Sequence, residues 1–356
     1  TSEFFSKKYN NKVQINWDKR SLQAFADRPI DLMVDEYDLM VIDYPHVGEV
    51  SAKGLLQKFD VDEYQSELNL LKEQSVGLSH QSYNIDGHQW ALAIDAATQV
   101  CCFRKDLISS LPQSWNELSN LAHQNKVLWP LKPVHAISSF YSIYNNITDE
   151  FNPKDKNFIN KEFGIKTLEM MKHITVDLIS DCFIMDPIKT AEILSSSDDF
   201  NYSPYTYGFS NYSRENFREN ILTYGNVMDL SNKGPNGTHL GGTGIAISNK
   251  SHHKDLALEY SYWIAGADCQ KSIFYKSGGQ PGNSIAWENQ QINDECNGFF
   301  ANTRLTLNQA WIRPRHNGYM KFQDESGEII NEYLQSNTNE DIIIDKLKIM
   351  YAESFE

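Results

Sequence analysis

The stretch His88–Leu107, HQWALAIDAATQVCCFRKDL, decides the fold. Apolar residues alternate with small ones up to Ile94, and β-branched, aromatic and thiol residues resume at Val100. The pattern predicts one long buried strand that is interrupted over residues 95–99. An ionised carboxylate between two buried strands is costly unless it is paired or hydrogen-bonded. We therefore expect Asp95 to line a pocket, with Gln99 close by; the alternative is that Asp95 caps a short helix.

The residues that follow predict a helix start and carry a resemblance. Ser114, with Glu117 three residues later, forms a capping box before the periodic Leu118. The strand with an acidic residue at its centre, the FRKDL run and the PQSWNEL helix start together resemble family 1 extracellular solute-binding proteins, the sugar-type receptors of bacterial ABC importers. The resemblance implies that this strand crosses from one lobe to a second, and that Asp95 meets ligand in the cleft.

The resemblance also implies the fold class and the domain division. It implies an α/β chain with the two-lobe periplasmic-binding-protein fold (type II), each lobe a mainly parallel sheet flanked by helices, with crossing hinge strands. Residues 1–95 and 244–292 would form the first lobe, and residues 96–243 and 293–356 the second. A glycine-rich run that opens an apolar strand is the family's return crossing, which puts Gly241, Gly242 and Thr243 at the ligand.

Composition excludes several classes of protein. A chain of 356 residues is long enough for two domains with a core each. Its net charge of -15 argues against nucleic acid, because phosphate binding needs concentrated Lys and Arg. No apolar run is long enough to cross a bilayer. The first residues, TSEFF, lack the basic opening and apolar core of a signal peptide, so we expect a periplasmic protein whose signal peptide is not part of this sequence.

The cysteines do not indicate a metal or redox site. There are five, without Cys-x-x-Cys spacing, and they are expected to be small buried hydrophobic residues. Cys269 and Cys296 are candidates for a bridge in an oxidising compartment, which the sequence alone cannot pair. We expect no cofactor and no metal.

Two predicted strand ends of the first lobe carry candidate ligand groups. Residues 13–17 alternate as a strand, and ligands of open α/β sheets sit beyond the carboxyl ends of strands. This makes candidates of Trp17, Asp18 and Arg20. A surface ion pair between Asp18 and Arg20 is the alternative.

The second strand end follows residues 37–43, a near-continuous apolar run that predicts a central parallel strand. It makes Asp43, Tyr44 and His46 candidates for the site. This run also resembles one branch of the family, whose members open with a further strand bearing its own Trp-Asp motif. That strand is not found in the sequence, so we expect the first element of the lobe to be missing.

The second lobe contributes an aromatic cluster and two arginines. Residues 200–212, FNYSPYTYGFSNY, interleave aromatics with small polar groups, and their Pro and Gly predict a pocket lining rather than a strand interior. Aromatic packing is the alternative. The candidates in this lobe are Tyr205, Tyr207, Tyr212, Arg313 and Arg315. Gln280, which lies in a glycine-rich turn that resembles a turn of the family, is a further candidate. The arginines, in a WIRPR run, would bind a carboxylate or polyol through two hydrogen bonds, and their alternative role is salt bridging. The alternative role of Gln280 is to stabilise its turn.

The predicted function is a periplasmic receptor that closes two lobes on a small polar ligand, a carbohydrate or sugar acid, and presents it to the membrane permease of an ABC importer. We expect a monomer that binds no nucleic acid. An alternative from another class is a carbohydrate-active enzyme that uses Asp43 and Asp95 as a carboxylate pair. No Gly-x-Ser-x-Gly, His-Glu-x-x-His or P-loop motif supports an enzyme. A third interpretation is an adhesion or signalling module, which no small ligand would stabilise.

Overall fold

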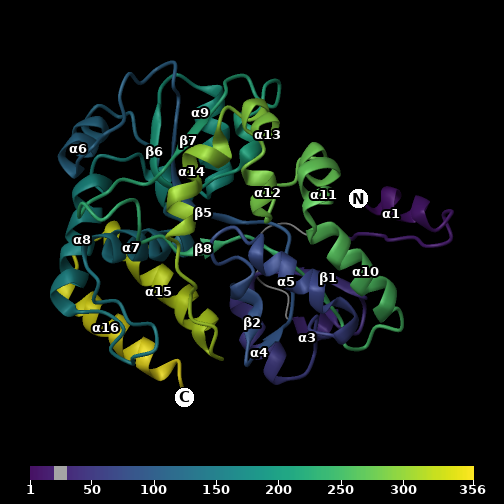
Figure 1. The fold of residues 1–356 in the computed structure, drawn as a ribbon. Helices are drawn as coiled ribbons and strands as arrows, with labels where there is room; N and C mark the ends of the chain where they lie inside the picture. The colour runs from purple at the N-terminus through teal and green to yellow at the C-terminus, as the bar shows by residue number, and fades with distance from the viewer. Residues whose placement is uncertain (20–29) are drawn as a thin grey trace. The chain divides into compact units, whose positions relative to one another are not determined.

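The structure is a computed structural model that describes residues 1–19 and 30–356. The chain forms two compact units. Unit 1 consists of Thr1–Ala96 and Gly242–Asn289, and unit 2 of Ala97–Gly241 and Gln290–Glu356. The division expected from the sequence ends its segments at residues 95, 243 and 292, whereas the units end theirs at 96, 241 and 289. Figure 1 labels the elements of both units.

Unit 1 contains a sheet of three described strands, β1 (Leu39–Ile42), β9 (Gly244–Ile247) and β4 (Leu92–Ala93), in the order β1-β9-β4. Both pairings are antiparallel. The prediction that residues 37–43 form a central parallel strand is therefore wrong, because among the described strands the fully buried β9 takes the central position and β1 lies at an edge. A separate hairpin joins β2 (Asn84–Ile85) to β3 (His88–Gln89).

Helices cover the sheet of unit 1 and close its core. The long helix α10 (Lys254–Ala265) contacts β9 and β4. The Phe5 ring of α1 (Ser2–Lys8) packs edge-on against the Tyr260 ring of α10, with centroids 5.1 Å apart. The other helices are α3 (Ile30–Met33), η1 (Tyr44–His46), α4 (Val47–Ala52), η2 (Asp62–Tyr64), α5 (Gln65–Glu73), η3 (Gln81–Tyr83), α11 (Ala267–Cys269), the π-helical η6 (Gln270–Phe274) and α12 (Ser284–Trp287).

The sheet of unit 2 is built around β5 (Ala97–Phe103), which pairs with β6 (Tyr202–Tyr207), β7 (Thr223–Gly225) and β8 (Leu240–Gly241). An interruption is confirmed, but it spans residues 94–96 and not 95–99 as predicted, because β4 ends at Ala93 and β5 begins at Ala97. The named strand pairs in the described residues are all antiparallel, in contrast to the mainly parallel sheets predicted. β5 and β9 each begin within a few residues of a point where the chain passes from one unit to the other. Each is antiparallel to the strands with which it pairs.

β6 corrects another expectation, since residues 202–207 form a strand interior in spite of Pro204. The register shifts there: Val100 lies opposite Thr206, but Cys102 lies opposite Ser203, so β6 has one extra residue. Proline has no N–H to donate, and a bulge of this kind accommodates it without the loss of a ladder hydrogen bond.

The helices of unit 2 enclose a large aromatic core around the fully buried Trp129. The capping box is confirmed, because Ser114 accepts the Glu117 N–H at 3.3 Å at the start of α6 (Trp115–His123). The remaining helices are α7 (Pro133–Ile147), α8 (Lys161–Thr175), η4 (Ser180–Phe183), α9 (Pro187–Ser196), η5 (Ser210–Ser213), α13 (Gln290–Glu295), α14 (Phe299–Asn308), α15 (Tyr319–Leu334) and α16 (Glu340–Glu353). Across the part of the chain that the structure describes, no helix is long and apolar enough to span a membrane.

Candidate functional site

Asp95 of unit 1 is half-buried, and one oxygen of its carboxyl group is shielded from solvent. No helix begins at it, so the capping alternative does not apply. Its carboxylate accepts the N–H of Ala96, while Oδ1 is buried and has no hydrogen-bond partner within residues 1–19 and 30–356. Burial raises the pKa of Asp95 to about 7; the Ala96 N–H opposes this shift and the charge of Asp43 adds to it. A ligand hydroxyl is the kind of donor that such an oxygen lacks.

The end of β1 supplies the second carboxylate of unit 1. Asp43 follows β1 directly and caps η1, where its Oδ1 accepts the Tyr44 N–H at 2.8 Å. Tyr44 itself is fully buried and packs edge-on against Tyr83, with ring centroids 6.3 Å apart. His46, the last residue of η1, is half-buried. Of these three candidates, Asp43 raises the pKa of Asp95 through its charge, and Tyr44 packs in the interior of unit 1.

Three further candidates hold the backbone at Asp95. Gly242 has φ +99°, and a Cβ there would come within 2.4 Å of the Asp95 carbonyl oxygen, so only glycine fits. The Thr243 carbonyl accepts the N–H groups of Ile94 and Asp95 at 3.0 and 3.1 Å. Gln280 donates from Nε2 to the Ala96 carbonyl at 3.2 Å. The structure thus gathers these residues around Asp95 as its supports.

Unit 2 brings together a phenol and two neutral imidazoles. The Tyr207 hydroxyl lies 3.1 Å from His239 Nδ1, and a Cβ on Gly241 would meet the Tyr207 ring at 2.6 Å. Burial, and next the positive charge of Arg313, hold the pKa of His239 well below its usual value. The His135 ring lies 6.2 Å from that of Tyr207, its Nδ1 is buried without a partner among the described residues, and burial lowers its pKa to about 4.

Sequence reasoning missed both histidines. His239 directly precedes the glycine-rich run, and His135 lies in the first turn of α7. Those positions could have indicated a site. The two histidines form no sequence motif, because α7, β6 and the residues before β8 are far apart in the sequence and meet only in the fold. Neutral imidazole and phenol both donate and accept hydrogen bonds, as hydroxyl groups of a ligand require.

Gln99 and Tyr205 have structural positions inside unit 2. Gln99 is fully buried; its Nε2 donates to Ser139 Oγ at 3.2 Å and its Oε1 accepts from Ser142 Oγ at 2.6 Å. Tyr205 belongs to the hydrophobic core, with its ring 5.7 Å from that of Trp129. These contacts give Gln99 a structural role and favour the packing alternative for Tyr205.

The remaining candidates of unit 2 are also engaged within it. The Tyr212 hydroxyl donates to Glu192 Oε1 at 2.6 Å. Arg313 is buried and donates from Nη1 to Gln323 Oε1 at 2.9 Å, and Arg315 is half-buried. The structure therefore does not gather Tyr205, Tyr207 and Tyr212 into one aromatic lining.

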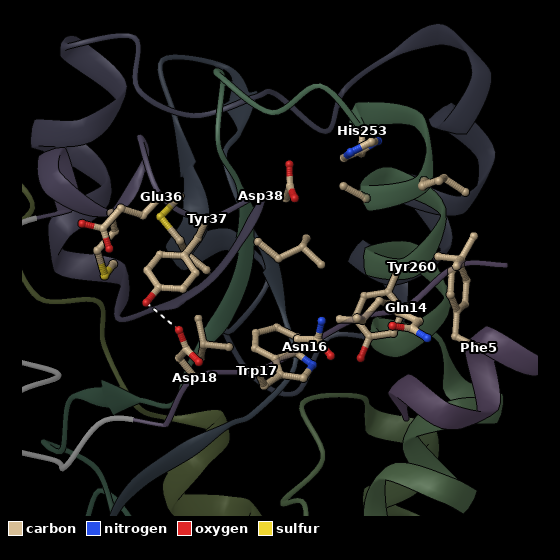
Figure 2. A pocket seen from close by; sticks show the side chains of 18 of the residues that line it. Phe5, Gln14, Asn16, Trp17, Asp18, Glu36, Tyr37, Asp38, His253 and Tyr260 are labelled. Atoms are coloured by element: carbon tan, nitrogen blue, oxygen red, sulfur yellow. Dashed lines mark hydrogen bonds between the residues drawn. The ribbon is translucent and has the colours of Figure 1, made fainter. Parts of the chain in front are cut away.

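Trp17 and Asp18 line a different place, a cavity of about 710 Å³ within unit 1 (Figure 2). Asp18 Oδ2 accepts the Tyr37 hydroxyl at 2.8 Å, and Trp17 is 39% exposed. Neither Asp43 nor Asp95 lines this cavity. Arg20, the third candidate of this group, lies outside the described residues. The strand predicted for residues 13–17 is not found, because the described structure assigns no strand there.

The described residues show no group of three or more His, Cys, Asp or Glu side chains that could hold a metal ion. All five cysteines are free and buried, which confirms the prediction that they are buried apolar residues. Burial raises the pKa of Cys101 to about 12, so its thiol stays protonated at neutral pH.

Comparison with solved structures defines the fold as that of ABC-transporter solute-binding proteins and confirms the predicted two-lobe α/β class. One such protein from Agrobacterium radiobacter, solved with ribitol, is 17% identical at a TM-score of 0.81, over 99% of this chain and 94% of that one. The GacH receptor of Streptomyces glaucescens, solved unliganded and with acarbose, is 15% identical at 0.79, over 99% and 93%. Maltose-bound MalE3 of T. maritima is 15% identical at 0.78, over 98% and 94%. The sequence matches no family model and no curated protein.

Proposed function

We propose that the protein is a solute-binding receptor for a polyol or small carbohydrate, which it delivers to the permease of an ABC importer from the periplasm. The observation that carries the proposal is Asp95, whose buried Oδ1 has no hydrogen-bond partner among the described residues, in a fold whose solved examples hold ribitol, acarbose and maltose. A polyhydroxyl ligand supplies the donor that Asp95 Oδ1 lacks.

The electrostatics favour a neutral ligand over a sugar acid. Asp95 titrates near pH 7 and Asp43 is close enough to raise its pKa, so a ligand carboxylate near Asp95 would meet like charge. Within unit 2, the imidazoles of His135 and His239 are uncharged at neutral pH and, with the Tyr207 hydroxyl, suit hydroxyl groups of a ligand. We therefore expect the ligand to be a neutral polyol or sugar. The sequence alone leaves both a carbohydrate and a sugar acid possible.

Hinge closure and delivery to a permease belong to the proposal. The chain passes between its units after Ala96, Gly241 and Asn289, and a hinge would act in those segments. Receptors of this class act as carriers and not as enzymes, so we expect the ligand to be released unchanged.

A thermal-shift screen tests the proposal. A ligand that binds only the native state raises the melting temperature, by the equivalent of about 2.7 kcal/mol at 100 times its Kd. The panel consists of ribitol, mannitol, glucose, maltose and gluconate. We expect a shift from the neutral compounds of one chemical class, its loss in Asp95→Ala, and its retention in Asp268→Ala, a change at an almost fully exposed carboxylate of the same unit. No shift from any compound with a folded protein would contradict the proposal, as would an undiminished shift in folded Asp95→Ala.

One observation favours a second function. A carboxyl with a pKa of about 7 next to a second carboxylate is what a glycosidase uses as its general acid. Incubation of the protein with disaccharides and nitrophenyl glycosides separates the two functions. Stoichiometric binding with the sugar recovered intact supports the receptor; product release that Asp95→Asn abolishes would establish an enzyme.

A further inference from the structure

The loop that follows the π-helical turn η6 lies against the chain segment that contains Asp95. A Cβ on Gly282 would lie 3.0 Å from the Asp95 backbone nitrogen and 3.1 Å from the Ile94 carbonyl carbon. Gln280 Nε2 donates to the Ala96 carbonyl at 3.2 Å. The loop therefore contacts the backbone of residues 94–96 closely and limits how far the backbone of Asp95 can move.

Gln270, the first residue of η6, anchors this loop. Its side chain is fully buried, its Oε1 accepts the Gly282 N–H at 2.7 Å, and its Nε2 donates to the Ile264 carbonyl at 2.8 Å. Ile264 lies in the last turn of α10, where helix carbonyls have no partner within the helix. A buried amide is costly unless it is hydrogen-bonded, and this one uses both of its ends to join the loop to a helix of the core.

Other contacts fix the shape of the loop between Gln270 and residues 94–96. Gly279 packs directly on the Phe274 ring of η6, where a Cβ would overlap the ring. The Trp287 indole N–H of α12 donates to the Pro281 carbonyl at 2.6 Å. π-helical turns are rare and are frequently found at functional sites. A loop of fixed shape passes a displacement at one end to the other.

We infer that Gln270 is a positioning residue for the ligand-binding carboxyl group of Asp95, and that it acts through the hydrogen bond from the Gly282 N–H to its side chain. Gln270 has no exposed surface that a ligand could contact. The inference rests on the proposed function for its effect on affinity. It deepens that function by naming a residue outside the site that sets the geometry of Asp95.

A purely structural role is the alternative, and unit 1 offers a matched control for it. Gln89 is also buried, and its Nε2 donates to the His80 and Ala91 carbonyls at 2.9 Å each. Neither of these bonds reaches residues 280–282 or residues 94–96. Loss of either glutamine side chain removes two buried hydrogen bonds, but only the loss of Gln270 should alter Asp95.

The first arm of the test needs no ligand. Burial, and next the charge of Asp43, raise the pKa of Asp95, so the contribution of this carboxyl group to stability falls as the pH rises from 4 to 7. That contribution is the difference in urea midpoint between a protein and its Asp95→Asn form. Gln270→Met should let water reach residues 94–96 and reduce the fall by at least half. Gln89→Met should lower the midpoint at every pH and leave the fall unchanged.

The second arm is isothermal titration with ribitol, mannitol and maltose. We expect Gln270→Met to bind the tightest of these compounds at least 10-fold more weakly, and Gln89→Met to bind it within twofold of the unmodified protein. Gly282→Ala, which adds a Cβ 3.0 Å from the Asp95 nitrogen, should weaken binding in the same way. It replaces Gln270→Met in both arms if that variant does not fold.

An undiminished fall or an unchanged affinity in the folded variant would overturn the inference. An equal change in Gln89→Met would overturn it as well, because it would show general loosening of unit 1. No binding of the three compounds by the folded protein would contradict the proposed function instead, and the first arm would still decide the role of Gln270.

Discussion

At the residue scale, the environment of Asp95 is set by backbone atoms. The Ala96 N–H bonds its carboxylate, the Thr243 carbonyl holds its own N–H at 3.1 Å, and Gly242 leaves room for its carbonyl. The carboxyl group is thus fixed in position, while its Oδ1 has no hydrogen-bond partner in the part of the chain that the structure describes. A residue that is preorganised to bind a ligand has a fixed position and an unused hydrogen-bond acceptor, whereas a structural residue has its acceptors occupied.

The raised pKa of Asp95 predicts how stability depends on pH. Between pH 4 and 7 the native state holds a proton on Asp95 that the unfolded state has lost, so this group makes the free energy of unfolding fall as the pH rises through that window. The full shift corresponds to at most about 4 kcal/mol. Asp95→Asn should remove this fall, and the exposed Asp268→Asn should keep it, in urea denaturation at half-unit pH steps. An unchanged slope in Asp95→Asn would show that the carboxyl titrates normally.

Gly242 gives a prediction with a matched control. Gly242→Ala places a Cβ 2.4 Å from the Asp95 carbonyl oxygen at φ +99°, which should lower the free energy of unfolding by at least about 2 kcal/mol and weaken ligand binding. Gly54→Ala, at φ +64° with nothing within 4 Å, should cost only about 1 kcal/mol. Equal effects in urea unfolding would mean that close packing at Gly242 is not important.

At the element scale, β5 is joined to α7 through a buried polar network. Gln99 of β5 bonds Ser139 and Ser142 of α7, and Ser139 also accepts the Trp129 indole N–H at 3.0 Å. Every member is buried, so loss of Gln99 removes one hydrogen bond each from Ser139 and Ser142, which keep their bonds to Trp129 and to the Ser138 carbonyl.

This network predicts a structural role for Gln99. Gln99→Leu should lower the free energy of unfolding by about 2 kcal/mol, because it removes a hydrogen bond from each of two buried hydroxyls, and should change ligand affinity less than threefold. Urea unfolding and a binding titration of the same sample separate the two effects. A large loss of affinity without a loss of stability would assign Gln99 to the ligand after all.

Elements defined by local sequence were predictable, and those defined by distant pairing were not. The break at Asp95 and the capping box of α6 depend on neighbouring residues and are confirmed. The edge position of β1 depends on β9, about 200 residues later, and β6 is a strand because β5 pairs with it. The supports of Asp95 came from the resemblance to a family, whereas His135 and His239 meet only through the fold.

At the scale of the whole molecule, two units with separate cores are linked by three chain passages. If these passages act as a hinge, ligand binding should change the size of the molecule. Small-angle X-ray scattering with and without saturating ligand checks this, and we expect a smaller radius of gyration with ligand. Gln280→Ala, which removes a bond to the Ala96 carbonyl next to one passage, should alter affinity without unfolding either unit. A radius of gyration that ligand leaves unchanged would contradict closure.

The most direct test of the central claim is isothermal titration of the purified chain with ribitol, mannitol and maltose, repeated with Asp95→Ala and Asp268→Ala. The account predicts saturable 1:1 binding of a neutral polyhydroxyl ligand, a loss of at least 100-fold in Asp95→Ala, and unchanged binding in Asp268→Ala. Binding that persists undiminished in folded Asp95→Ala, or no binding of any such ligand by the folded protein, would contradict it.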